Sequence, residues 1–173
     1  MERNTKQNII LTGFMGSGKT SVGICLSYRL RKILLDTDKE IERRQGKTVS
    51  DIFAQDGEEA FRRMETEYIK ELLNATESRI VSTGGGMPVR EENRTLLKKL
   101  GTVIYLEASP ETVYERLKED TTRPLLQNGD AEKKITGLLA KRQDFYKSGA
   151  DMIIRTDDKS IDEIAEEIMA GLK

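Results

Sequence analysis

The sequence predicts one α/β domain in which a parallel sheet is covered by helices on both faces. Short β-branched runs alternate with helical patterns along the chain, which is typical of parallel sheets. The first of these runs ends in a glycine-rich loop of the kind that binds phosphate. The 173 residues are enough for one such core and too few for two, so we expect a single domain over residues 1–173.

The glycine-rich loop follows a strand expected over Asn8–Thr12. Residues 13–20 read GFMGSGKT, which matches the phosphate-binding pattern G-x-x-x-x-G-K-[ST]. Gly13, Gly16 and Gly18 permit positive φ and keep side chains away from backbone N–H groups that must face a polyphosphate. This pattern predicts that the chain binds a nucleoside triphosphate.

A helix expected over Lys19–Leu30 would aim its N-terminus at the bound anion. Lys19 would then reach the β- and γ-phosphates, and the hydroxyl of Thr20 would hold Mg²⁺. The alternative is a chance glycine-rich turn, but a strand directly before the loop and a helical pattern directly after it favour the functional interpretation.

The remaining elements follow from apolar periodicity and from helix caps. Further strands are expected at Ile33–Leu35, Arg79–Ser82, Thr102–Leu106 and Met152–Arg155. Further helices are expected after the cap Thr48, along the apolar face from Phe61 to Leu72, over Arg90–Lys99, from Pro110 after the cap Ser109, over Ala131–Lys147, and after the capping box of Ser160 and Glu163. Ligands of such sheets bind beyond the carboxyl ends of the strands, so the loops after the first three strands should meet there.

Asp36 and Asp38 follow the second predicted strand. In an extended segment, residues two apart point the same way, so both carboxylates should face the triphosphate. We assign Asp36 to Mg²⁺, through water, and Asp38 to an acceptor hydroxyl as its proton acceptor. The alternative is an Asx-type cap for a helix over Lys39–Arg44.

Three consecutive glycines, Gly84, Gly85 and Gly86, follow the third predicted strand. We interpret them as a second backbone cradle, in which a substrate lies against bare N–H groups. The alternative is a flexible turn before Pro88.

Arg142 lies on the apolar stripe of its predicted helix, among Ile135, Leu138, Leu139, Phe145 and Tyr146. An inward-facing charge needs a partner, because an unpaired buried charge is very costly. Arg62 is a second candidate, with Glu65 one turn on to orient it. Two such arginines beside the glycines suggest a small substrate with a carboxylate. The alternative for each is an internal salt bridge or a solvated face.

Two further arginines lie late in the chain. Arg123 falls in the loop Thr121–Gly129, where it could close over the γ-phosphate as part of a lid. Arg116 could stack on the base by a cation–π contact, and its alternative is an ordinary surface charge.

Composition excludes several classes of function. The formal net charge of −1 disfavours a nucleic-acid partner, and no apolar run approaches the about 18 residues of a membrane span. The single cysteine, Cys25, excludes an internal disulfide, and together with a polar N-terminus this indicates a reducing, cytoplasmic location. The absence of histidine leaves carboxylates, Lys, Arg and backbone groups for the chemistry.

In combination these motifs resemble the shikimate kinases over essentially the whole chain. The resemblance rests on Gly13–Thr20, Leu35–Asp38, Phe61–Glu65, Ser82–Gly86, Arg123–Leu126, and Arg142 with Tyr146 and Ala150. The loop Asp157–Lys159 departs from the family, which often has a proline there beside the adenine.

The resemblance implies a three-layer αβα P-loop kinase fold like that of nucleoside-monophosphate kinases. It has a five-stranded parallel sheet in the order 2-3-1-4-5, a substrate-binding segment over about 37–65 and a lid over about 118–130. It further implies a monomeric enzyme that phosphorylates the 3-hydroxyl of shikimate with ATP and Mg²⁺, a step toward chorismate and the aromatic amino acids.

The resemblance also implies roles for individual residues. The shikimate site would comprise Asp38, Arg62, Gly84, Gly85, Gly86 and Arg142. The nucleotide site would comprise Gly16, Ser17, Gly18, Lys19, Thr20, Ser21, Arg116 and Arg123. Lys19, Asp38 and Arg123 would be catalytic, and Thr20 and Asp36 would hold the metal.

Two other functions remain open from the sequence. One is another small-molecule kinase of this fold, such as a gluconate or nucleotide kinase, although the inward Arg142 favours an acceptor with a carboxylate. The other is a nucleotide-binding module that no longer catalyses and acts by contacting a partner.

Overall fold

The computed structural model describes residues 8–118 and 130–173. Arg123 and the predicted lid, apart from its two end residues, therefore lie outside the described residues. No helix in the described part of the chain is both long enough and apolar enough to span a bilayer.

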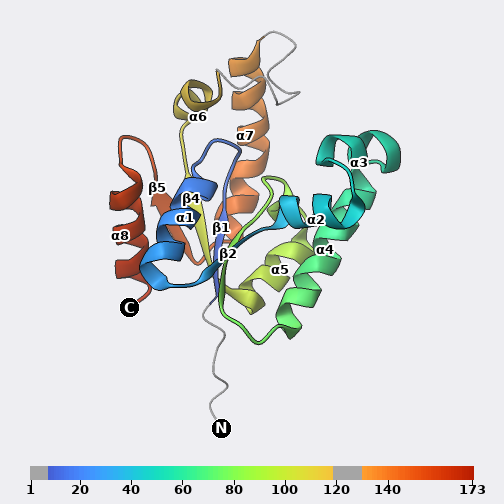
Figure 1. Cartoon of the computed structure of the whole chain (residues 1–173). Helices are drawn as coiled ribbons and strands as arrows, with labels where there is room; N and C mark the ends of the chain where they lie inside the picture. The colour runs from blue at the N-terminus through green and yellow to red at the C-terminus, as the bar shows by residue number, and fades with distance from the viewer. Residues whose placement is uncertain (1–7, 119–129) are drawn as a thin grey trace.

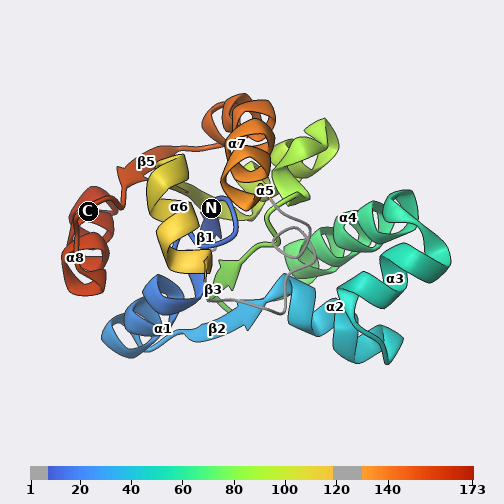
Figure 2. The same cartoon turned by 90° about the horizontal axis from the view of Figure 1, so that it is seen from above.

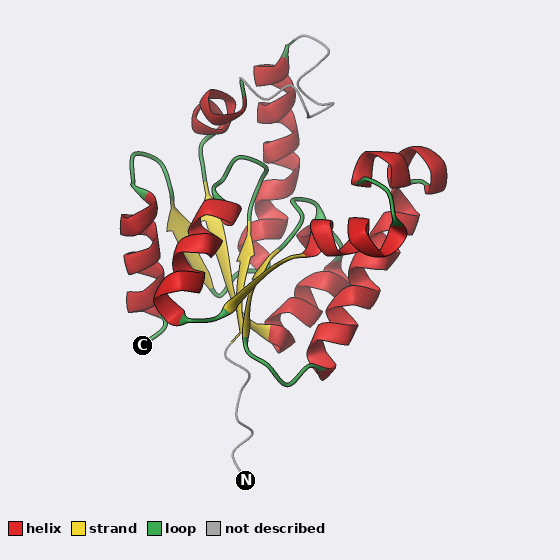
Figure 3. Ribbon diagram, in the orientation of Figure 1, coloured by secondary structure: helices red, strands yellow, loops and turns green. Residues whose placement is uncertain are grey.

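Five parallel strands form one sheet in the order β2-β3-β1-β4-β5, which confirms the expected fold class and strand order (Figure 3). The strands are β1 Asn8–Thr12, β2 Ile33–Asp36, β3 Arg79–Ser82, β4 Gly101–Glu107 and β5 Met152–Arg155. Each agrees with its sequence prediction to within one residue at either end. The strands β1, β2 and β3 are neighbours, so the three loops that carry the candidate motifs emerge at one edge.

Helices cover both faces of the sheet (Figure 2). They are α1 Lys19–Leu30, α2 Thr37–Gln45, α3 Val49–Asp56, α4 Glu58–Asn74, α5 Glu91–Leu100, α6 Pro110–Leu117, α7 Ala131–Ser148 and α8 Ile161–Gly171, with a 3-10 turn η1 at Met87–Val89. Side chains alternate along β1: Ile9 and Leu11 pack with α1 and α8, whereas Ile10 packs with α4 and α5. Two apolar cores thus hold the strand that leads into the phosphate loop.

The helices α2, α3 and the start of α4 project from the sheet as an arm (Figure 1). The arm has a small apolar cluster of its own, made of Ile41, Ile52 and Phe61. Phe53 packs edge-on against Phe61, with 5.1 Å between the ring centroids. The cluster fixes α4 where its first turns can reach the sheet edge, and the arm coincides with the segment expected to bind substrate.

A further apolar cluster joins the phosphate loop to α6 and α7. Phe14, in the loop, is 1% exposed and packs among Tyr105, Val113 and Ile135. Tyr146 of α7 stacks on Tyr105 with 5.0 Å between ring centroids. Helix α7 is therefore anchored beside both the phosphate loop and the sheet edge.

Helix caps set several boundaries as the sequence predicted. Thr48, Ser109 and Ser160 accept hydrogen bonds from the backbone N–H groups of Asp51, Thr112 and Glu163, respectively. These bonds satisfy N–H groups that have no partner inside the helix.

Candidate active site

A cavity of about 250 Å³ lies at the carboxyl ends of β1, β2 and β3. Its walls are the phosphate loop, the first residues of α1 and α2, and the loop after β3, with Lys19, Thr20, Asp36, Asp38 and Gly84 among the lining residues. The fold thus brings together three motifs that are separated by about 70 residues of sequence.

The phosphate loop has the backbone that its glycines predicted. Gly13, Gly16 and Gly18 have φ values of 149°, 78° and 100°. These are values that residues with a side chain rarely adopt. Gly18 is the N-cap of α1, so the N-terminus of that helix opens into the cavity.

Lys19 turns back onto its own loop. Its ammonium donates hydrogen bonds to the carbonyl oxygens of Gly13, at 2.6 Å, and Phe14, at 3.1 Å. Thr20 and Ser21 are exposed in the first turn of α1 and line the cavity. The hydroxyl of Ser17 is buried and has no hydrogen-bond partner within residues 8–118 and 130–173.

Asp36 and Asp38 do not leave an extended segment together, so that part of the sequence interpretation was wrong. Asp36 is the N-cap of α2, and its Oδ1 accepts a 3.0 Å hydrogen bond from the backbone N–H of Lys39. The cap ends the strand at once, and Asp38 already lies in the first turn of α2. Both carboxylates nevertheless line the same cavity.

The carboxylate of Asp38 is held in an unusual environment. Its Oδ1 is buried and makes no hydrogen bond to any described residue. Burial and the negative charge of Asp36 raise the pKa of Asp38 to about 6, against the opposing effect of Lys19 and Arg62. An unsatisfied buried oxygen of this kind indicates a position for an external hydrogen-bond donor.

The glycines after β3 differ from the predicted cradle in one respect. The N–H of Gly84 is already used, since it donates a 3.1 Å hydrogen bond to the hydroxyl of Thr37. The carbonyl of Gly85 accepts a 2.6 Å hydrogen bond from the hydroxyl of Tyr146. The amides of Gly85 and Gly86 donate to no acceptor that the structure describes, so the cradle has two free N–H groups instead of three.

Gly84 and Gly86 are required because a side chain would not fit at either position, and not because their φ angles are unusual. A Cβ at position 84 would overlap Oδ1 of Asp38 and lie 3.0 Å from its Cγ. A Cβ at position 86 would overlap the guanidinium of Arg62. The bare backbone therefore lets a carboxylate and a guanidinium approach the same short loop from two sides.

Arg62 lies against Gly86 and is oriented by two carboxylates. It pairs with Glu65 at 2.6 Å and with Glu58 at 3.3 Å, and its side chain is 12% exposed. Glu65 is fully buried, and its second oxygen has no hydrogen-bond partner within the described part of the chain. Burial raises the pKa of Glu65 to about 7, against the effect of Arg62. The predicted orienting role of Glu65 agrees with this geometry.

Arg142 is half-buried beside Gly85, as its place on the apolar stripe suggested. A Cβ at position 85 would lie 3.6 Å from Nη1 of Arg142, and the guanidinium carbon lies 5.9 Å from the centroid of the Phe14 ring. Within residues 8–118 and 130–173, no carboxylate lies within 4.0 Å of this guanidinium. Arg142 is thus a partly desolvated cation that could accept an anionic ligand as its counter-ion.

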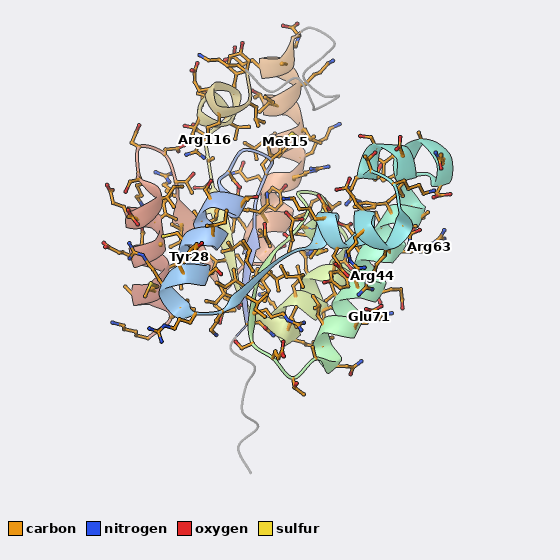
Figure 4. The ribbon with its side chains drawn as sticks, viewed as in Figure 1. Met15, Tyr28, Arg44, Arg63, Glu71 and Arg116 are labelled. Atoms are coloured by element: carbon orange, nitrogen blue, oxygen red, sulfur yellow. The ribbon has the colours of Figure 1, made fainter. Side chains whose placement is uncertain are left out.

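Arg116 lies at the end of α6, near Met15 of the phosphate loop (Figure 4). Its guanidinium donates to the carbonyl of Gly16 at 2.9 Å and to the carbonyl of Thr156 at 3.5 Å. It therefore bridges the phosphate loop and the loop after β5. Arg116 is thus held beside the phosphate loop by hydrogen bonds, unlike an ordinary surface arginine, and its position suits a contact with a nucleotide.

The loop Asp157–Lys159, which departs from the family pattern, is also anchored. Asp157 accepts a 3.1 Å hydrogen bond from the N–H of Ser109. Partial burial favours a higher pKa for Asp157, but hydrogen bonds from Thr112 and Ser109 outweigh this effect and hold the pKa below its usual value. A carboxylate here ties the loop after β5 to the start of α6.

A polar network that the sequence did not predict joins α4, which carries Arg62, to the loop after β3. Asn93 of α5 is fully buried and accepts a 2.7 Å hydrogen bond from the hydroxyl of Thr66. The Asn93 amide donates at 3.0 Å to the carbonyl of Met87, directly after the glycines. No sequence signal marks an asparagine in a polar helix as buried, so only the structure could reveal this brace between α4 and the loop after β3.

Together these groups form a site with two anion-binding regions and a carboxylate between them. The phosphate loop with Lys19 and Arg116 can hold a polyphosphate, and Arg62 with Arg142 can hold a second, smaller anion. Asp38 lines the cavity at the phosphate loop, and its carboxylate lies against Gly84. Arg62 and Arg142 do not line this cavity, but they approach the same glycine loop at Gly86 and Gly85.

Comparison with known proteins gives a consistent result. The family model for shikimate kinase matches residues 15–173. A shikimate kinase of Symbiobacterium thermophilum is 44% identical over 168 residues, which are 96% of each chain. One from Bacillus anthracis is 44% identical over 162 residues, covering 94% of this chain and 96% of the relative.

Solved structures agree with these sequence matches. The shikimate kinase of Acinetobacter baumannii, solved in complex with shikimate, superposes with a TM-score of 0.89 at 38% identity, covering 97% of this chain and 93% of that one. The enzyme from Aquifex aeolicus gives a TM-score of 0.82 at 34% identity, with 96% of each chain covered. A gluconokinase from Sinorhizobium meliloti shares the fold at a TM-score of 0.57 and 16% identity, with 98% of this chain and 93% of that one covered.

Proposed function

The chain belongs to the shikimate kinase family, and from this premise we propose that it transfers the γ-phosphoryl group of ATP to the 3-hydroxyl of shikimate. The product is shikimate 3-phosphate, an intermediate on the way to chorismate and the aromatic amino acids. ATP is the co-substrate of the family.

The observation that carries the proposal is the pair of guanidinium groups at the glycine loop. Arg62 lies against Gly86 and Arg142 against Gly85, while the unbonded oxygen of Asp38 lies against Gly84. A ligand that satisfies all three needs an acid group at one end and a hydroxyl at the other. Shikimate has both, whereas a polyol without an acid group does not.

The acid group of the acceptor would bind the two arginines. Guanidinium groups bind carboxylates through paired, charge-assisted hydrogen bonds, which also fix the plane of the ligand. The free amides of Gly85 and Gly86 can add donors on the same side. Glu65 keeps Arg62 in place, because one of its oxygens is bonded to the guanidinium at 2.6 Å.

Asp38 would accept a hydrogen bond from the reacting hydroxyl and orient it toward the γ-phosphate. A carboxylate with a pKa of about 6 is a stronger base than an ordinary aspartate and is still ionised at neutral pH. A loose transition state requires little proton removal in advance, so orientation is the larger part of this role. Lys19 would neutralise charge on the transferring phosphoryl group.

Thr20 and Asp36 suit Mg²⁺, which prefers hard oxygen ligands and usually retains several waters. The Thr20 hydroxyl is exposed at the cavity wall, and Asp36 uses one oxygen for its cap, which leaves the other available. Mg²⁺ bound there would neutralise phosphate charge, and Asp36 would orient its waters.

Three further parts of the proposal come from sequence alone. Arg123 would contact the γ-phosphate from a lid over about 118–130, which lies mostly outside the described residues. We also propose that the enzyme is a monomer and works in the cytoplasm, where its single cysteine remains reduced.

The direct test is ATP turnover by the purified protein with and without shikimate, together with identification of the product. Shikimate should stimulate turnover strongly, whereas gluconate and nucleoside monophosphates should not. A lack of stimulation by shikimate contradicts the proposal, and preferential use of another acceptor identifies a different kinase. Tight ATP binding without turnover on any acceptor would instead favour a non-catalytic module.

A further inference from the structure

We propose that Thr37 is a positioning residue for phosphoryl transfer, because its hydroxyl binds the N–H of Gly84 and thereby fixes Asp38 against the glycine loop. The inference rests on the proposed function and concerns a residue between the two aspartates of the site. Thr37 does not contact the reacting atoms itself, since it is fully buried.

The Thr37–Gly84 bond extends the sheet beyond its last backbone pair. The ladder between β2 and β3 ends at Asp36 and Ser82, because the chain turns into α2 directly after Asp36. A helical residue can no longer offer its carbonyl sideways to a neighbouring strand. The hydroxyl of Thr37 replaces that missing acceptor at 3.1 Å.

Asp38 depends on this bond because no hydrogen bond within residues 8–118 and 130–173 holds its carboxylate, on which Lys19 and Arg62 act only through their charge. Its Oδ1 is buried without a hydrogen-bond partner, and the adjacent Gly84 leaves no gap that a Cβ could fill. The position of the carboxylate is therefore set by the backbone at residues 37 and 84. If that backbone contact loosens, Asp38 moves relative to the acceptor hydroxyl.

The same bond decides which amides face the ligand. With the Gly84 N–H engaged, only Gly85 and Gly86 can donate outward, and Tyr146 fixes the carbonyl between them. Thr37 therefore affects both the carboxylate of Asp38 and the glycine amides that face the acceptor. In the described part of the chain, the Thr37 hydroxyl makes no hydrogen bond to the phosphate loop that follows β1.

Thr37→Val and Thr37→Ser separate the hydroxyl from the shape of the side chain. Valine retains the volume but leaves the buried Gly84 N–H without an acceptor, whereas serine keeps the acceptor. For Thr37→Val we expect kcat with shikimate to fall about 10- to 100-fold, the size of effect that a small misplacement of a reacting group produces. KM for ATP should be unchanged, and Thr37→Ser should keep most of the wild-type kcat.

Equal activity of Thr37→Val and wild type overturns the proposal. So does an equal loss in both variants, because the methyl group and not the hydroxyl would then matter. A parallel rise in KM for ATP also overturns it, since that pattern indicates general disruption of the sheet edge.

Amide exchange in the wild-type protein provides a second test that does not depend on a variant folding. The Gly84 amide should exchange much more slowly than the neighbouring amides of Gly85 and Gly86, and equal exchange rates overturn the proposal. A wild-type protein without shikimate-dependent turnover counts against the proposed function, and the amide measurement still decides whether Thr37 fixes the loop.

Discussion

Tyr146 of α7 donates a 2.6 Å hydrogen bond to the carbonyl of Gly85, 61 positions earlier in the chain. The same helix carries Arg142 one turn before, so one rigid element delivers a cation to the site and fastens the loop that the cation faces.

Replacing Tyr146 with phenylalanine should loosen this loop. The variant leaves the Gly85 carbonyl without its donor, so we expect a stability loss of about 1 kcal/mol. KM for shikimate should rise about 2- to 10-fold in steady-state kinetics. Tyr105→Phe is the matched control, because Tyr105 stacks on Tyr146 but its hydroxyl bonds to no residue that the structure describes. Equal effects of the two variants would show that the hydrogen bond from Tyr146 to Gly85 does not hold the loop.

Removing either inward arginine should weaken shikimate binding and leave ATP binding intact. For Arg142→Ala and Arg62→Ala we expect KM for shikimate to rise about 10- to 100-fold, since each loses charge-assisted hydrogen bonds. Arg63→Ala is the control, because Arg63 is exposed on α4 next to Arg62 (Figure 4). Titration calorimetry with ATP should distinguish the two sites, and a similar loss of ATP affinity would contradict the assignment.

Gly86→Ala should impair the site without straining the backbone. Gly86 has a φ of −93°, which alanine adopts freely, but the added Cβ would overlap Arg62. We expect a clear rise in KM for shikimate. Gly137→Ala is the control, since nothing lies within 4 Å of its added Cβ and it should stabilise α7 by about 0.5–1 kcal/mol. Unchanged kinetics for Gly86→Ala would show that Arg62 does not need this position.

Glu65→Gln should flatten the dependence of stability on pH. The pKa of Glu65 is raised from 4.5 to about 7, so between these values the folded protein keeps a proton that the unfolded chain has released. Wild-type stability should therefore fall as pH rises through this window, by at most about 3 kcal/mol from this group. Urea unfolding of the ligand-free proteins at pH 5 and pH 8 should show a smaller difference for the glutamine variant. An identical difference would place the titration elsewhere.

Arg116→Ala should affect the nucleotide and not the acceptor. Loss of the bridge between Gly16 and Thr156 should raise KM for ATP about 2- to 10-fold, with KM for shikimate unchanged. Arg155→Ala provides the control, because Arg155 is an exposed arginine nearby that pairs only with Glu107 among the described residues. A rise confined to KM for shikimate would contradict the position assigned to Arg116.

Much of the fold could be predicted from local signals. Strand ends, the caps Thr48, Ser109 and Ser160, and the positive φ of Gly13, Gly16 and Gly18 depend on neighbours in sequence, and each is found as predicted. The prediction failed at Asp36 and Asp38, where a helix cap competed with the extended conformation and prevailed.

The rest of the site depends on long-range contacts that have no sequence signature. In the sequence, Thr37 is only the residue between Asp36 and Asp38, yet its hydroxyl accepts a hydrogen bond from Gly84, 47 positions away. Asn93 and Thr66 look like surface residues of polar helices, but both are buried. Arg142 could be found because a charge on an apolar stripe is conspicuous in the sequence, whereas a polar side chain with its hydrogen bonds satisfied inside the fold is not.

The two hydrogen bonds of Lys19 to the carbonyls of Gly13 and Phe14 make phosphate binding an exchange of partners. An incoming anion must draw the ammonium away from acceptors that already satisfy it. A singly charged anion offers the ammonium one negative charge in exchange for two carbonyl oxygens. A triphosphate offers several negative charges close together, and the attraction grows with that charge. We therefore expect the loop to bind a triphosphate in preference to small, singly charged anions.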